Sequence, residues 1–139
     1  MRLLPSERKE LVDKAIRIFL KTGELSIYEP CDCGSLIRHN NGGNYHEIIH
    51  LKKDGQSCFI MEDLTSELEE PAQWREVSES IAIEKIQKCG DWLNPQDYQI
   101  PEGDLIMIKL RRRIEDALRK TATEEDLKVI ATYLNVKIV

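Results

Sequence analysis

This sequence has no long apolar run. No stretch approaches the ~20 consecutive apolar residues that a membrane-spanning helix requires. The opening segment, Met1 to Pro5, is too short an apolar stretch to predict a signal peptide. From these absences we expect a soluble, cytoplasmic protein.

An excess of positive charge is also missing. The 20 lysines and arginines are outnumbered by 25 acidic residues, which gives a net charge of −5. Phosphate backbones and anionic lipid surfaces attract basic proteins, so we expect neither a nucleic-acid partner nor a membrane partner. The basic stretch from Lys109 to Lys120 does not alter this expectation. Glu115 and Asp116 lie four residues from arginines and can pair with them on a solvent-exposed helix face.

The common enzyme motifs are absent as well. The sequence contains no G-x-S-x-G nucleophile elbow, no P-loop and no G-x-G-x-x-G fingerprint. Gly42-Gly43 does not lead into a predicted helix, so it is not expected to cradle a phosphate. We therefore predict no catalytic residues and no cofactor.

Paired cysteine motifs are scarce. The four cysteines are Cys31, Cys33, Cys58 and Cys89. A structural zinc site could draw on Cys31 and Cys33 together with His39, His46, His50 or Cys58. However, C-x-C is not the usual C-x₂₋₄-C spacing, and there is no second close pair. In a reducing compartment we expect free, mostly buried thiols and no stoichiometric zinc.

One stretch, Tyr45 to Asp63, supports two incompatible interpretations. His46-Glu47-Ile48-Ile49-His50 is an H-E-x-x-H motif, which binds zinc when a helix brings both imidazoles to one face. Glu79-Ser80-Ile81-Ala82 resembles the glutamate-helix pattern of the gluzincin family, and the resemblance implies a compact zinc metallopeptidase with a downstream glutamate as third ligand. On a strand, the two histidines would instead lie roughly 13 Å apart, too far to share one ion.

The alternative interpretation is a β-hairpin, and we favour it. Asp54-Gly55 lies between two apolar runs, which is a strong signal for a two-residue type I′ turn. This turn fixes the register of the two strands. The predicted pairs are Lys53–Gln56, Leu51–Cys58, Ile49–Ile60 and Glu47–Glu62 on one face, and Ile48–Met61 and His50–Phe59 on the other.

The rest of the chain predicts helices around a small sheet. Apolar spacing predicts a helix over residues 6–22 with Ser6 as its cap, followed by short extended pieces at 25–28 and 35–38. Further helices are predicted at 72–89, 105–120 and from Thr123 onward, with an acidic connection at 62–71 and a linker at 91–104. The expected fold is a single α+β domain over residues 1–139: an N-terminal helix, an antiparallel meander of three to four strands, then three helices.

Both faces of the predicted hairpin are largely apolar, whereas an antiparallel sheet commonly shows one polar face to water. The helix at 6–22 can cover only one of them. We expect the face of Ile48, His50, Phe59 and Met61 to bind another protein or a second copy, there or along a strand edge. The function that follows is a small intracellular, non-enzymatic protein-binding factor of an accessory, assembly-chaperone or regulatory kind.

Overall fold

The computed structural model describes residues 3–30, 43–65 and 74–136. They form an N-terminal helix, a four-stranded antiparallel sheet and then three α-helices, which is the predicted α+β fold. The chain divides into two compact units, Met1–Glu102 and Gly103–Val139. The single domain expected over residues 1–139 stays a prediction.

The N-terminal helix α1 spans Pro5–Thr22 and begins slightly earlier than expected. Its cap is Leu4 rather than Ser6, with Pro5 in the first turn, where a missing N–H costs nothing. The Glu7 carboxylate accepts a hydrogen bond from the Leu4 N–H at 3.0 Å. Gly23 ends the helix in the left-handed conformation, φ +82°, which glycine adopts without strain.

The sheet has the order β1-β2-β3-β4, with every neighbouring pair antiparallel. Its strands are β1 Glu24–Pro30, β2 Gly43–Lys53, β3 Gln56–Thr65 and β4 Arg75–Val77. Strands β2 and β3 form the predicted hairpin, and the observed register contains each of the predicted pairs. Asp54 and Gly55 have φ values of 54° and 81°, as a type I′ turn requires.

Gly55→Val is expected to destabilise the protein by about 1–3 kcal/mol, because a β-branched residue is strained at positive φ. The added Cβ itself causes no clash, since at Gly55 it would meet nothing within 4 Å. Urea denaturation measures the change. Lys53→Val, in extended backbone at the end of β2, is the control and should stay within about 0.5 kcal/mol of the original protein. Equal effects of the two substitutions would contradict a turn that depends on glycine.

The predicted helix over residues 72–89 is wrong in its first part. Arg75–Val77 forms the short edge strand β4, and the helix α2 spans only Glu79–Lys88. Ser78 explains the boundary, because its hydroxyl accepts a hydrogen bond from the Ile81 N–H at 3.2 Å and caps the helix. The strand β3 also runs to Thr65, through part of the segment expected to be an acidic connection.

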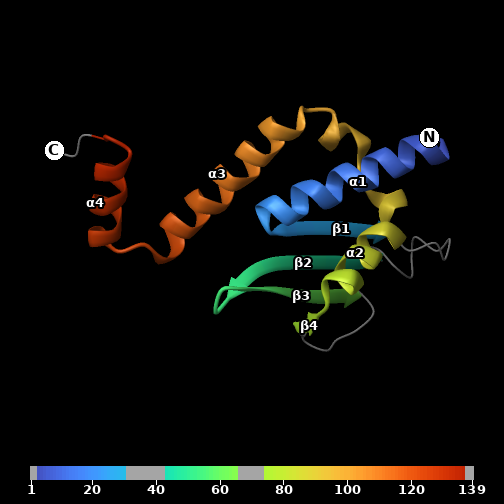
Figure 1. The fold of residues 1–139 in the computed structure, drawn as a ribbon, viewed down its shortest axis with the longest axis horizontal. Coiled ribbons are helices and arrows are strands. Elements are labelled where there is room, and N and C mark those ends of the chain that lie inside the picture. The colour runs from blue at the N-terminus through green and yellow to red at the C-terminus, as the bar shows by residue number, and fades with distance from the viewer. Residues whose placement is uncertain (1–2, 31–42, 66–73, 137–139) are drawn as a thin grey trace, which may run out of the picture. The chain divides into compact units, whose positions relative to one another are not determined.

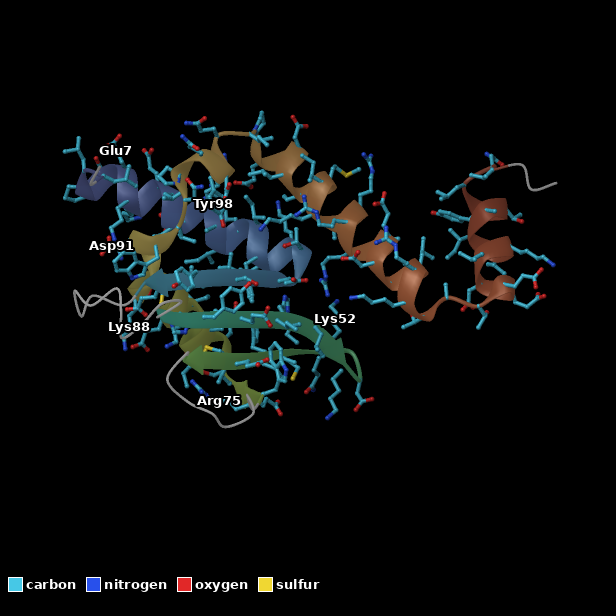
Figure 2. The ribbon with its side chains drawn as sticks, turned by 180° about the vertical axis from the view of Figure 1, so that it is seen from behind. Glu7, Lys52, Arg75, Lys88, Asp91 and Tyr98 are labelled. Carbon is cyan, nitrogen blue, oxygen red and sulfur yellow. The ribbon has the colours of Figure 1, made fainter. Side chains whose placement is uncertain are left out.

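The segment expected to be a linker is tied to α1. It contains two 3₁₀ turns, η1 Gly90–Trp92 and η2 Pro95–Tyr98. The Lys14 ammonium donates to the carbonyl oxygens of Tyr98 and Ile100 at 2.6 and 2.9 Å. Asp91 lies beside α1, where it pairs with Arg8 at 2.6 Å (Figure 2). These contacts hold residues 91–100 against α1 within the N-terminal unit.

One face of the sheet carries the core of the N-terminal unit, and we call it the inner face. Helices α1 and α2 both pack on it, and Figures 1 and 2 show α2 in front of the strands and behind them, respectively. Its buried side chains include Leu11, Val12, Ala15, Phe19, Leu25, Ile27, Ile48, Phe59, Met61, Ala82, Ile86 and Cys89.

The C-terminal unit is helical. Helix α3 spans Glu102–Thr121 and helix α4 spans Glu124–Tyr133. The capping box predicted at Thr123 is present: its hydroxyl accepts from the Asp126 N–H at 3.2 Å, and the Asp126 carboxylate accepts from the Thr123 N–H at 3.0 Å. Among the described residues, no helix has the length and apolar character to cross a membrane.

Candidate functional site

The four residues predicted to bind a partner lie on the inner face. Ile48, Phe59 and Met61 are 0%, 4% and 1% exposed, and α1 and α2 cover them. His50 stacks on Phe59 with ring centroids 4.4 Å apart, and its Nε2 lies 3.0 Å from the Ser57 hydroxyl. The expectation that this face is open is therefore corrected, because its apolar side chains form the core.

The opposite side of the sheet, which we call the outer face, has neither α1 nor α2 over it. Its apolar side chains are partly or largely exposed. It includes Glu24, Ser26 and Tyr28 on β1, Tyr45, Glu47, Ile49 and Leu51 on β2, Cys58, Ile60 and Glu62 on β3, and Glu76 on β4. Because side chains alternate along a strand, the residues that fill the core fix which of their neighbours point outward.

Carboxylates cross the middle of the outer face. Glu47 and Glu62 are directly opposed on β2 and β3, and Glu62 is only 8% exposed. Partial burial raises the pKa of the Glu47 carboxyl, and the negative charges of Glu62 and Glu24 raise it further. Opposed like charges destabilise a sheet. The free protein therefore keeps an acidic, partly desolvated strip on a partly apolar surface.

Glu47→Gln is expected to stabilise the protein by about 0.2–1 kcal/mol at neutral pH, because it removes one charge of an opposed pair. The gain should depend on pH. A raised pKa means that the folded state binds more protons than the unfolded state, so the ionised Glu47 destabilises the fold above its folded pKa. Below the ordinary value of 4.5 the carboxyl is protonated in both states, and the gain should disappear. Urea melts of both proteins across this range measure it; a gain that is independent of pH would contradict the charge explanation.

The surroundings of Cys58 do not favour the reactive thiolate form of its side chain. Burial, the hydrogen bond to the Glu76 carboxylate and the charge of that group raise the pKa of the Cys58 thiol. A thiol with a raised pKa carries little thiolate at neutral pH, and the thiolate is the reactive form. The hairpin also places His50 on the inner face and Cys58 on the outer face. These two residues therefore form no cysteine–histidine pair.

The H-E-x-x-H motif lies within strand β2. Four residues along a strand separate His46 and His50 by roughly 13 Å, and Glu47 points to the opposite face. Glu79 is exposed in the first turn of α2. This arrangement does not bring the motif's two imidazoles to one ion, so it gives no support to the metallopeptidase alternative.

A second cluster joins residues that the sequence did not connect. Glu29 on β1, His46 on β2 and Cys89 at the C-cap of α2 place one potential ligand atom each within 4.8 Å of the others. The sequence offered only the residue types: Cys89 fits the apolar side of a predicted helix, and no local spacing links it to His46. Cys31, Cys33 and His39, weighed for a zinc site, lie outside the described residues.

Comparisons with known proteins identify no relative from which functional residues could be assigned to this chain. A scan against protein-family models, a search of curated proteins and a search of solved structures each find no match to this chain.

Proposed function

We propose that this chain is a small, non-enzymatic protein-binding factor, of an accessory, assembly-chaperone or regulatory kind, that docks a partner protein on the outer face of its sheet. The observation that carries the proposal is the composition of that face. Exposed Leu51 and partly exposed Ile49 and Ile60 lie beside the opposed carboxylates of Glu47 and Glu62. Apolar surface favours association, and the carboxylates select the charge of the partner.

The partner that fits is a protein segment in which basic side chains alternate with apolar ones. In the free protein, partial burial and then the charge of Glu62 raise the pKa of the Glu47 carboxyl. A lysine or arginine placed over Glu47 would offset the repulsion between the two carboxylates. A second copy is the less favourable occupant. Two-fold contact between identical outer faces would bring the same acidic strip of each copy together.

The compartment proposed for this protein is the cytoplasm. Cys58 on the outer face is a free thiol. A free thiol suits a reducing compartment, whereas secreted domains commonly use their cysteines in disulfides.

Site-specific photocrosslinking in the source cells tests the proposal. A photoreactive phenylalanine analogue replaces Leu51 on the outer face or, as a control, Glu10 on the solvent-exposed side of α1. The Leu51 probe is expected to crosslink another protein at a peptide rich in basic and apolar residues, and the Glu10 probe is not. Adding Glu47→Lys to the Leu51 probe should abolish this crosslink.

Circular dichroism and thermal melting confirm that each probe protein is folded. Three results would overturn the proposal: crosslinks from Leu51 to a second copy alone, equal crosslinking from Glu10, or a partner crosslink that survives Glu47→Lys. The last result is the most direct, because it would show that the acidic strip does not select the partner.

A further inference from the structure

Contrary to the expectation of no stoichiometric zinc that the sequence gives, we infer that Glu29, His46 and Cys89 form a zinc site that clamps α2 to the end of the sheet. The three residues come from three separate elements, β1, β2 and the C-cap of α2. Their carboxylate, imidazole and thiol groups are all zinc ligands in proteins. The inference is independent of the proposed function, because these donors belong to the inner side of the sheet and the partner surface is the outer face.

The strand register explains how the first two donors meet. Ile27 on β1 is directly opposite His46 on β2, and Glu29 lies two residues further along β1. Glu29 and His46 are therefore diagonal neighbours on one face, within reach of long side chains. The Glu29 Oε2 and His46 Nε2 atoms lie 3.1 Å apart.

The third donor comes from the end of α2. This helix packs over the inner face through Ala82 and Ile86, and its C-cap residue Cys89 is 4% exposed. All three potential ligand atoms lie within 4.8 Å of one another. Tetrahedral zinc with one sulfur, one nitrogen and one oxygen ligand requires separations of about 3.3–3.7 Å. Small side-chain rotations would therefore bring the set to a common ion.

The chemistry of the donor set favours zinc over other cations. Calcium and magnesium prefer sites made of oxygen ligands, whereas thiolate and imidazole donors suit zinc. Burial also favours a structural role. The His46 side chain is 5% exposed and Cys89 is 4% exposed, so a substrate has little access to either. Water or a further side chain would occupy the fourth position of the tetrahedron.

The test starts from protein stripped with a chelator and titrated with zinc alone, with native mass spectrometry to count bound ions. One zinc per chain is expected. Cobalt then serves as a spectroscopic probe, because a thiolate ligand gives a charge-transfer band in the near ultraviolet that a hydrogen-bonded cluster does not. Zinc binding should weaken as the pH falls, because protons compete for the thiolate and the imidazole.

Three conservative variants identify the ligands: Cys89→Ser, Glu29→Gln and His46→Gln. Each is expected to lower zinc affinity at least tenfold, and Cys89→Ser should also abolish the cobalt band. Cys58→Ser is the matched control, because Cys58 is the other cysteine that the structure describes and lies on the outer face. It should retain both the zinc and the band. Circular dichroism of the metal-free proteins separates a lost ligand from a lost fold.

The inference is overturned if the stripped protein takes up no zinc. It is also overturned if Cys89→Ser keeps the ion and the cobalt band, including the case in which only substitutions at Cys31 or Cys33 remove them. A band that disappears in Cys58→Ser would place the ion on the wrong side of the sheet and would equally refute the site.

Discussion

Phe59→Asp is expected to abolish folding, whereas Leu51→Asp is expected to leave the protein folded. Phe59 is 4% exposed and its ring lies against those of His50 and Phe19, with centroid separations of 4.4 and 6.1 Å. The substitution removes these contacts and buries a carboxylate without a counter-ion. The cost should reach ~5 kcal/mol or more, which is comparable to the total stability of many domains.

Leu51 is a suitable control because it lies in the same hairpin on the other face of the sheet. It is 37% exposed, so an aspartate there can keep its water and should cost no more than about 1 kcal/mol. Circular dichroism and urea denaturation compare the two variants. If both unfold, the outer face is covered in solution and the proposed docking surface is lost. If both stay folded, the inner face is not the core.

Gly90→Ala is expected to destabilise the protein by about 1–3 kcal/mol through overpacking. A Cβ added at Gly90 would lie 2.5 Å from Val12 Cγ2 and 2.9 Å from Arg8 Nη2. Neither group can yield easily. Val12 is a buried β-branched residue, and the Arg8 guanidinium is held by Asp91 at 2.6 Å and by the Gln87 carbonyl oxygen at 2.8 Å.

Gly103→Ala provides the matched control in helix α3. An added Cβ there meets nothing within 4 Å, and alanine favours a helix over glycine by up to about 1 kcal/mol. Denaturant melts should therefore show a loss of stability for Gly90→Ala and no loss of stability for Gly103→Ala. A neutral Gly90→Ala would mean that α1 and η1 are not in close contact.

Local patterns were sufficient to predict the hairpin. Asp54-Gly55 fixes a two-residue turn, and a turn of that length leaves one register for the strands on either side. Local patterns were also sufficient for the end of α1 at Gly23 and for the start of α4 at the Thr123 capping box, but not for the start of α1, where Leu4 and not Ser6 is the cap. They failed at Arg75–Val77, where pairing with β3 overrides an apolar spacing that also fits a helix.

Local patterns could not predict which of the two faces of the sheet would stay uncovered by α1 and α2. Ile48 with Met61 and Ile49 with Ile60 are equally apolar pairs, so periodicity assigned two apolar faces without saying which one α1 would cover. In the structure, α1 covers the face of Ile48, Phe59 and Met61. These side chains pack in one cluster with Phe19 of α1 and Ile86 of α2. The predicted site residues thus became the core, and the outer face became the candidate site.

By itself, the sequence determined the α+β class through the order of its helical and strand patterns, and it determined the register of the hairpin through the Asp54-Gly55 turn. Only the tertiary structure decided which sheet face is open and that Glu29, His46 and Cys89 converge. Those outcomes depend on how α1 and α2 pack on the sheet. Packing joins residues that are distant in the chain, and no local spacing records which of them will meet.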